Sequence, residues 1–557
     1  MINGKSLLSA LLMTLAPFTA PALAQLDVQI ESEADRFLKE QQLQREREEL
    51  QRQQPLLAEP EQEEENNFSD KICFTIDSVE VDGVEAIDKQ LVNDLTQEVI
   101  GQCIGQKRIA KLLQAINALY MDRGFITTRA YLPEQNLSRG KLLIKVLEGR
   151  VEKVQLNESS LSDRTRLWAA LPGTEVGSVL NMRHLEQAVD QLDAPPSVKS
   201  QIKLWPGEEV GTSLVEITTT EKNRFRANIS TDNDGQENTG KQRLKFGLGM
   251  DNLLSLNETM NLNYIGSRDT NALIFQLSLP FRRFNFSFTR SYSEYLSILS
   301  EYSELFGQSD STYMNLDYML FRNTKHKITL KSGLSLRESI RYINDTELVP
   351  QKLTVASLGV EHRYIAEKSR WLSSLNYSRG LDTLDATTDP ADLVDAAPHA
   401  QFSKLEANVH FSRPLGELAY LQSLLAAQYA FDSLYGSEQV HLGGLGTVRG
   451  FIGQPFSGDR GFYLRNDVSW PKAGKALSEW VPFIDVSLSS FIDLGYVKSR
   501  AENIYGRFEE SLSGMGFSVN AYYGDSRIAL TLATPLHASQ QHIKDDYQLS
   551  FSVNLNF

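Results

Sequence analysis

The chain has 557 residues, too many for one ordinary domain, and its 71 acidic against 56 basic residues give a net charge of −15 at pH 7. So acidic a chain is a poor candidate for a protein that binds the nucleic-acid backbone, and no nucleic-acid partner is expected. Residues 27–70 hold 14 acidic and 5 basic residues, so most of the imbalance lies near the N-terminus.

Residues 1–24 have the pattern of a signal peptide. Lys5 supplies the positive charge, residues 7–16 are apolar, and Ala22-Leu23-Ala24 forms a small-residue cleavage site. An anchoring helix is the alternative, which Pro17 disfavours because it ends the apolar run early. No later stretch approaches the ~20 apolar residues of a spanning helix. The mature protein is therefore expected to be exported, either soluble or inserted in a membrane as a β-barrel.

Residues 25–54 are predicted to form a helix, because they are rich in Glu, Gln, Arg and Leu and contain neither Gly nor Pro. Apolar positions are sparse, and a helix that is polar nearly all round does not fit an apolar core. It must lie in water, bridge domains, or occupy a polar lumen as a pore plug. Residues 55–70, with two prolines and an acidic run, are predicted to be a disordered linker. A solvated tail over the whole stretch is equally consistent with the composition.

Two small α+β units follow, over residues 71–149 and 150–221. Each combines short alternating strands with amphipathic helices, most clearly over 107–121 and 182–192. Units of this size offer little room for catalysis but suit peptide capture by strand addition. We expect an edge strand and an apolar groove over 107–132 to bind a partner. The candidate partner-binding residues are Lys107, Leu112, Ile116, Tyr120 and Tyr131.

The chain contains two cysteines, Cys73 and Cys103. Export to an oxidising compartment favours a disulfide between them. It would close a loop of about 30 residues and contribute roughly 3–4 kcal/mol of stability in the chain-entropy model. Two unpaired buried thiols are the alternative. The eight histidines lack the spacing of metal ligands, so no metal or other cofactor is expected.

Residues 222–557 contain no convincing helix and read as short alternating runs separated by polar turns. Most runs have about 9–12 residues, the length that a tilted strand needs to cross a bilayer, and an even count suits a single-chain outer-membrane barrel. The final run is the cleanest, because Tyr547, Leu549, Phe551, Val553, Leu555 and Phe557 alternate strictly with polar residues. The sixteen predicted strands are 223–231, 241–251, 258–266, 271–280, 283–292, 311–321, 326–337, 352–363, 371–379, 401–412, 419–431, 461–470, 484–495, 512–523, 526–535 and 546–557.

A glycine-rich loop between the eleventh and twelfth predicted strands carries the sequence Val448-Arg449-Gly450-Phe451. The loop has about 29 residues, and connections of that length are usually functional. Arg449 offers a fork of donors that suits a carboxylate. Asp493, between outward-facing Ile492 and Leu494, should point into the lumen. We expect the loop to enter the lumen and Arg449 to pair with Asp493. The alternatives are a solvated loop arginine and a lumenal carboxylate without a special partner.

Enzyme signatures are missing from the sequence. There is no GxSxG, HExxH or P-loop motif. Gly444-Leu445-Gly446 could begin a dinucleotide fingerprint, but Arg449 stands where a glycine is needed. Residues 232–235 faintly resemble a calcium loop, without the downstream acidic ligand. No catalytic activity is expected.

Several motifs together resemble the outer-membrane transporters of two-partner secretion, the TpsB family, over essentially the whole mature chain. Val448-Arg449-Gly450-Phe451 is similar to the tip of that family's lumenal loop, and Phe491, Asp493 and Gly495 match the strand motif that receives its arginine. Arg465-Asn466-Asp467 resembles the motif on the preceding strand. Residues 131–150, 181–188 and 204–207 resemble the two POTRA units that precede the barrel.

The resemblance implies an α-helical plug, two α+β POTRA units in the periplasm and a 16-stranded antiparallel barrel in the outer membrane of a Gram-negative cell, with the barrel over 222–557. The protein would be a monomer that contacts outer-membrane lipids. It would recognise the N-terminal secretion domain of a large TpsA-type exoprotein, such as an adhesin, haemolysin or contact-dependent toxin, and export it unfolded without ATP.

Two other classes of protein remain open. An outer-membrane assembly factor of the same superfamily would share the barrel, but such proteins usually carry more POTRA units and no N-terminal helix. A passive diffusion porin would have no use for two capture units or for the Val448-Arg449-Gly450-Phe451 loop.

Overall fold

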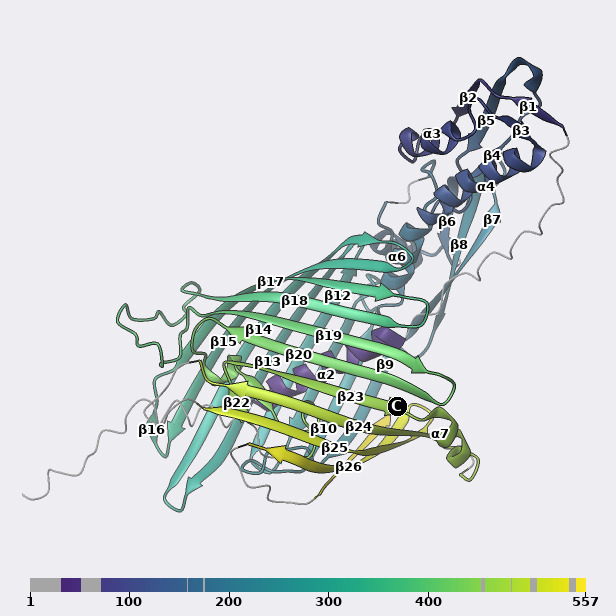
Figure 1. Ribbon diagram of the computed structural model, residues 1–557. Coiled ribbons are helices and arrows are strands. Elements are labelled where there is room, and N and C mark those ends of the chain that lie inside the picture. Colours follow the sequence, from purple (N-terminus) through teal and green to yellow (C-terminus); the bar gives the residue numbers. More distant parts are fainter. Residues whose placement is uncertain are drawn as a thin grey trace, which may run out of the picture.

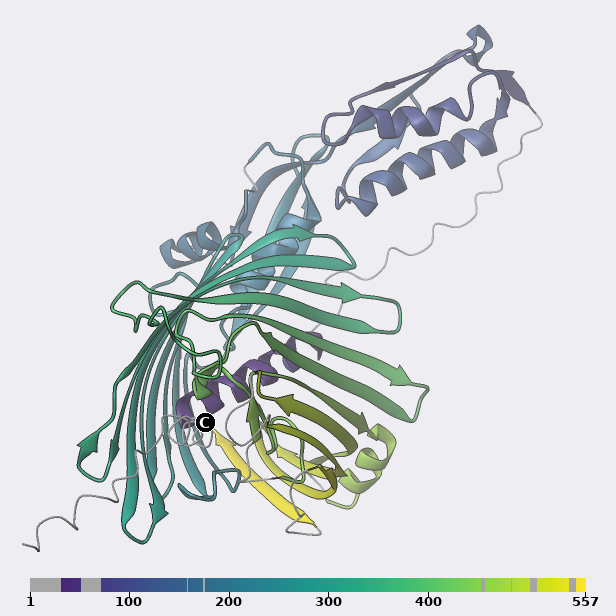
Figure 2. The same cartoon turned by 60° about the vertical axis from the view of Figure 1, so that its left-hand side comes forward.

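The computed structural model describes residues 32–51, 72–157, 159–173, 176–451, 456–481, 483–500, 508–539 and 547–557. The predicted signal peptide and the predicted linker lie outside the described residues. Two small α+β units extend in series from one end of a large barrel, and helix α2 (Glu33–Gln51) lies inside the barrel (Figures 1 and 2). No helix in the described part of the chain is long and apolar enough to cross a membrane.

The first unit packs two helices on a three-stranded sheet of order β2-β5-β4. Its core includes Ile76, Ile116 and Ile144, which are fully buried because alternate strand residues and one helix stripe face each other. A separate two-stranded sheet pairs β1 with β3. The elements are β1 (Cys73–Thr75), β2 (Ser78–Asp82), α3 (Lys89–Gln97), β3 (Cys103–Gly105), α4 (Gln106–Asp122), β4 (Arg129–Tyr131), η1 (Leu137–Arg139) and β5 (Lys141–Leu147).

The second unit repeats this plan with a sheet of order β6-β8-β7 covered by two helices. A capping box at Ser160 and Asp163 starts α5, and Asn181 caps α6. Leu185 and Leu192 of α6 are fully buried against the sheet. The elements are β6 (Arg150–Leu156), α5 (Leu161–Ala170), α6 (Met182–Leu192), β7 (Val198–Pro206) and β8 (Thr212–Glu221).

The barrel closes through antiparallel pairing of sixteen strands in the described part of the chain, with the last strand paired to the first, which confirms the predicted architecture. A two-residue strand, β16 (Thr346–Glu347), extends one hairpin beyond the wall. The sixteen strands are β9 (Phe225–Asp232), β10 (Arg243–Asp251), β11 (Thr259–Gly266), β12 (Thr270–Phe281), β13 (Phe284–Ser300), β14 (Ser303–Arg322), β15 (His326–Ile343), β17 (Gln351–Ile365), β18 (Arg370–Leu381), β19 (Ser403–Leu415), β20 (Ala419–Ala430), β23 (Arg460–Ser469), β24 (Asp485–Lys498), β25 (Glu509–Tyr523), β26 (Ser526–Ala538) and β27 (Gln548–Asn556).

Two expectations about the barrel region are wrong. Several strands are longer than the predicted 9–12 residues, and β14 has 20. At the end of the barrel away from the second unit, these strands continue beyond the length that is needed to cross a bilayer. A short helix, α7 (Pro471–Ser478), also lies in this region, between β23 and β24. Pro471 occupies the first turn of α7, where the N–H that proline lacks would have no partner within the helix. A proline directly after β23 can therefore begin a helix.

Candidate functional site

The loop between β20 and β23 has secondary structure of its own and packs against the barrel through apolar residues. It contains a 3₁₀ turn, η2 (Gly436–Glu438), and a hairpin of β21 (Val440–Leu442) and β22 (Phe456–Gly458). Val448 and Phe451, at the tip, are buried in a cluster with Leu442 and Val497. This apolar burial stabilises the position of the loop tip independently of its charged contacts.

Arg449 projects from the loop tip onto β24. Its Nε lies 2.7 Å from Asp493 Oδ2, its Nη2 lies 2.8 Å from Oδ1, and its backbone N–H donates to the same carboxylate at 3.1 Å. Arg449 is 5 % exposed and Asp493 is fully buried. A two-pronged, charge-assisted contact in such a dry site is among the stronger polar interactions in proteins.

Two further groups complete the surroundings of the guanidinium. Arg449 Nη1 donates to Asp467 Oδ1 of β23 at 2.6 Å, so two carboxylates face one guanidinium. The ring of Phe491 lies under it, with 3.6 Å between the ring centroid and Cζ. Nearby Arg465 donates to the carbonyl oxygen of Gly446, which ties β23 to the loop once more.

Glycines allow this close approach. Gly450 has a φ of +104°, which only glycine adopts readily. A Cβ on Gly514 of β25 would lie 1.9 Å from the carbonyl oxygen of Arg449, and one on Gly495 would lie 2.7 Å from Val448 Cγ2. The barrel wall therefore has glycines, which lack side chains, where the loop tip packs against it.

Helix α2 contacts the lumenal wall mainly through charged side chains near its N-terminus. Arg243 of β10 lies 3.1 Å from Glu33 Oε2 and 3.3 Å from Glu40 Oε1. Farther around the wall, Asp35 accepts hydrogen bonds from Tyr313 of β14 at 2.7 Å and from Arg337 of β15 at 2.8 Å. These bonds connect the N-terminal half of the helix to two separate parts of the lumenal wall.

The rest of α2 is held more lightly. Ala34 meets a small apolar patch of the wall that includes Ile265 and Ile274. Glu46 pairs with His410 of β19, and Arg47 Nη2 lies 3.7 Å from Asp467, the same carboxylate that binds Arg449. The helix and the loop therefore share one acidic residue.

The second unit is docked on the nearby barrel turns. The turn residue Arg282 donates its backbone N–H to the carbonyl of Ala169 at 2.6 Å and accepts a hydrogen bond from Gln191 at 2.6 Å. Asp190 of α6 lies 2.7 Å from Arg322 Nη1 and 3.3 Å from Lys327 Nζ. Burial alone would raise the pKa of Asp190, but these two cations outweigh it and hold that pKa below its usual range, so the carboxylate stays charged.

The predicted partner-binding residues of the first unit do not share one surface. Leu112, Ile116 and Tyr120 are buried in the core, because the apolar face of α4 packs on its own sheet, so the predicted apolar groove is not formed by them. Burial and a hydrogen bond to Glu148 raise the pKa of Tyr120 and keep it a donor. Lys107 and Tyr131 are exposed.

The edge of β4 is also less open than the sequence suggested. The backbone N–H of Ala130 donates to the side chain of Asn117 at 2.7 Å, which occupies the outward donor of this three-residue strand. Strand β2 at the other edge of the sheet has five residues and pairs only with β5 among the described strands.

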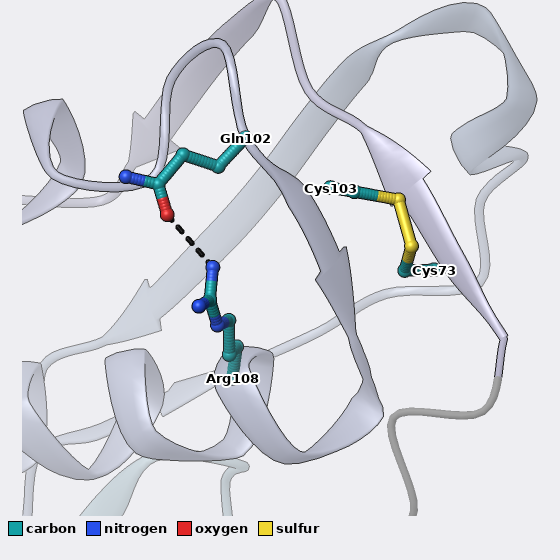
Figure 3. Close-up of a disulfide and its surroundings, with 4 residues drawn as sticks. All are labelled: Cys73, Gln102, Cys103 and Arg108. Carbon is teal, nitrogen blue, oxygen red and sulfur yellow. Dashed lines mark hydrogen bonds between the residues drawn. A yellow bond between two sulfur atoms is a disulfide. The ribbon is translucent and has the colours of Figure 1, made fainter.

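Cys73 and Cys103 form a disulfide that links β1 to β3 (Figure 3). The nearby side chains of Gln102 and Arg108 are joined by a 2.7 Å hydrogen bond on the same segment (Figure 3). Within the described residues, no cluster of His, Cys, Asp or Glu has the arrangement of a metal site.

Sequence reasoning singled out Arg449 and Asp493 but missed several residues of the site. It noted Asp467 only as part of a motif, and it did not identify Arg243, Arg337 or His410. Each of these faces the lumen from a strand, so charged residues at inward positions of the alternation were the available signal.

Comparison with protein families supports this organisation. The model described as haemolysin secretion/activation protein ShlB/FhaC/HecB matches residues 211–521. A ShlB-type POTRA domain model matches 74–149, and a second POTRA model matches 150–206. The two α+β units are therefore POTRA domains.

Characterised relatives cover most of the chain. It is 30% identical over 516 residues to the outer membrane transporter CdiB of Escherichia coli strain 536, covering 90% of this chain and 86% of the relative. It is 34% identical over 415 residues to CdiB of Dickeya dadantii, covering 72% of each. The solved structure of CdiB from Escherichia coli has a TM-score of 0.85 and 28% identity, covering 98% of this chain and 100% of that one.

Proposed function

The chain belongs to the ShlB/FhaC/HecB family of haemolysin secretion/activation proteins, and we propose that the Arg449–Asp493 contact holds its lumenal loop in place while a partner exoprotein crosses the barrel. Its relatives are outer-membrane transporters of two-partner secretion, so this chain is an outer-membrane transporter with its POTRA units in the periplasm. Transporters of this type work with a separate TpsA-type exoprotein. The buried two-pronged contact is the observation that carries the proposal.

The proposed role of the loop follows from its burial. The exported chain must pass beside the loop tip, and a tip held by Arg449, Phe451 and Val448 does not follow it out of the barrel. In this proposal the transporter works as a monomer, because a single chain supplies the loop, the helix and the barrel wall that they contact. We expect the exported haemolysin, adhesin or contact-dependent toxin to cross the barrel in unfolded form.

Charge reversal tests this role. Arg449→Glu places three carboxylates together, and Asp493→Arg opposes two guanidiniums, so either variant loses about 3–5 kcal/mol of local stability and cripples secretion. Arg449→Lys keeps the charge but not the fork, and we expect intermediate secretion. Secreted exoprotein is measured by immunoblot, and heat-modifiable migration confirms that each barrel is folded. Normal secretion by a folded charge-reversal variant would refute the role of the contact.

Helix α2 acts as a removable plug in this proposal. Its support is its position inside the barrel and its attachment through ion pairs rather than a large apolar face. Its C-terminal end leads to the POTRA units, so a partner bound there could draw it out of the lumen.

Partner capture is assigned to the first POTRA unit. Tyr131 is exposed on β4 at one edge of the sheet, Lys107 is exposed at the start of α4, and β2, which pairs only with β5 among the described strands, forms the other edge. A photo-crosslinking amino acid at position 131 and another at Glu80 of β2 distinguish the two edges. Exoprotein crosslinks that form at neither position, but form elsewhere on the transporter, would refute capture by this unit.

A further inference from the structure

A groove lies where the second POTRA unit meets the outer wall of the barrel. It encloses about 310 Å³ and is lined by Pro172 of the second unit and by Arg282, Arg283, Phe284 and Tyr318 of the barrel. The β12–β13 turn forms its floor, and this turn lies at the periplasmic end because the second POTRA unit is hydrogen-bonded to it.

The aromatic lining faces the lipid rather than the lumen. On β12, Ala272 and Ile274 contact the lumenal helix, so the odd-numbered residue Phe281 points outward. Phe281 pairs with Phe284, and Phe284 pairs with Tyr318, whose rings lie 4.8 Å apart. Rings facing lipid at one end of a barrel strand mark the depth of the headgroups.

The second POTRA unit adds an exposed aromatic residue at the same depth. Trp168 of α5 is 54% exposed and packs edge-on against Phe281, with 5.1 Å between ring centroids. Its helix neighbour Leu161 is 82% exposed. An exposed tryptophan beside an outward-facing ring is typical of residues that lie in the membrane interface.

Two arginines in this apolar setting have no carboxylate partner within the described part of the chain. The Arg282 guanidinium lies 5.6 Å from the Trp168 ring and 5.4 Å from the Phe281 ring, and its buried Nε has no hydrogen-bond partner among the described residues. Arg283 Nη2 lies 3.4 Å from His184 Nε2. Burial, together with Arg283, lowers the pKa of His184, so the imidazole is neutral and does not balance the charge.

We propose that this groove binds one glycerophospholipid of the periplasmic leaflet, with its phosphate at Arg282 and Arg283 and an acyl chain along Phe284 and Tyr318. The positive charge of the two guanidiniums in this apolar setting matches the phosphodiester. The outward rings continue directly into the lipid-facing wall. A bound lipid would brace the second POTRA unit against the membrane surface, which is separate from the action of the loop and of α2.

The test uses the full-length protein in detergent and counts retained lipid by native mass spectrometry. The variant Arg282→Asn with Arg283→Gln removes both charges. Asparagine tolerates the φ of +55° at position 282, and the backbone bonds of Arg282 to Ala169 and Gln191 do not need the arginine side chain. Arg268→Gln, at the opposite end of the barrel and 66% exposed in its side chain, is the matched charge control.

Phosphatidylglycerol is titrated against a diacylglycerol with the same chains. We expect wild type and Arg268→Gln to retain one phosphatidylglycerol per chain, at least about tenfold more tightly than the double variant, and none of the proteins to retain the diacylglycerol equally well. Equal retention by wild type and the double variant would overturn the site, provided that heat-modifiable migration shows both to be folded. Equal retention of the diacylglycerol would overturn recognition of the phosphate.

Discussion

The lumenal loop and helix α2 occupy the same barrel but are held in different ways. At the loop tip, Arg449 is 5 % exposed and Asp493 is fully buried, and apolar neighbours surround both. Along α2, only Glu33, Ala34 and Asp35 are buried among the side chains described, while the others are half-buried or exposed.

Under the proposed function, the loop contact persists during export and the helix contact is broken. Water competes weakly for a buried two-pronged ion pair, and breaking it leaves a charge stranded in a dry site. The ion pairs of α2 range from buried, as between Glu33 and Arg243, to partly exposed, as between Arg47 and Asp467, and water and salt readily replace the partner only in the exposed ones. In the proposed function the loop stays in the lumen and the helix leaves it, and the smaller apolar contact of the helix supports this assignment.

The largest effect is expected when the wall under the loop tip is filled. In Gly514→Ala the new Cβ meets the Arg449 carbonyl oxygen at 1.9 Å, and a backbone atom cannot rotate away as a side chain does. The tip must shift, and we expect secretion to fall at least about tenfold, the change that 1.4 kcal/mol produces. Exoprotein in the medium is measured by immunoblot.

The control for this substitution lies in the same loop. Gly446 has nothing within 4 Å of the position that a Cβ would take, so Gly446→Ala should secrete like wild type. Equal secretion by Gly514→Ala and Gly446→Ala, at equal amounts of folded barrel, would mean that the tip position does not matter.

Removal of the helix should have the next largest effect. Deletion of residues 27–54 empties the lumen of α2 without touching the loop, so single-channel conductance in planar bilayers should rise while the Arg449–Asp493 contact persists. Gln42→Ala, an exposed position on α2, serves as the matched control and should leave conductance unchanged. A deletion variant with wild-type conductance would mean that α2 does not block the pore.

The sequence allowed much of this comparison to be predicted. Strict alternation in the last strand and an even strand count indicated the barrel, because lipid-facing and lumen-facing residues must alternate. Arg449 and Asp493 could be paired because Asp493 takes a lumenal position in the alternation of its strand, and because the family resemblance matches both residues to motifs that meet. The polar composition of α2 was consistent with a lumen, although a solvated tail explained it equally well.

Other features could not be predicted, for physical reasons. Arg243 and Arg337 were not identified because lumenal charges are common in barrels, and their partners lie about 200 and 300 residues away. Leu112 and Ile116 were misassigned because the apolar stripe of an amphipathic helix looks the same whether it lines a groove or its own core. The hydrogen bond that the Asn117 side-chain oxygen accepts from the edge of β4 depends on tertiary contact alone.

A smaller effect is expected from weakening one helix contact. Asp35→Asn removes the charge that faces Arg337 at 2.8 Å and keeps the shape of the side chain. We expect more frequent openings in bilayer recordings than in wild type, but lower conductance than in the deletion variant, because the contacts of Glu33 and Glu40 remain. Glu417→Gln, an exposed acid on a turn, is the charge control. Openings as rare as in wild type would assign retention of the helix to its apolar patch.

The smallest expected effect is that of salt, and it separates the two modes of attachment directly. The Debye length falls from about 10 Å at 0.1 M to about 3 Å at 1 M ionic strength, which weakens exposed pairs far more than buried ones. Raising KCl over this range should increase the open probability of wild type modestly, because Arg47–Asp467 and Lys245–Glu40 are partly exposed. The proteolytic resistance of the loop should not change, since its ion pair is dry. An open probability that ignores salt would mean that Ala34 and its apolar neighbours, rather than charge, hold α2 in the lumen.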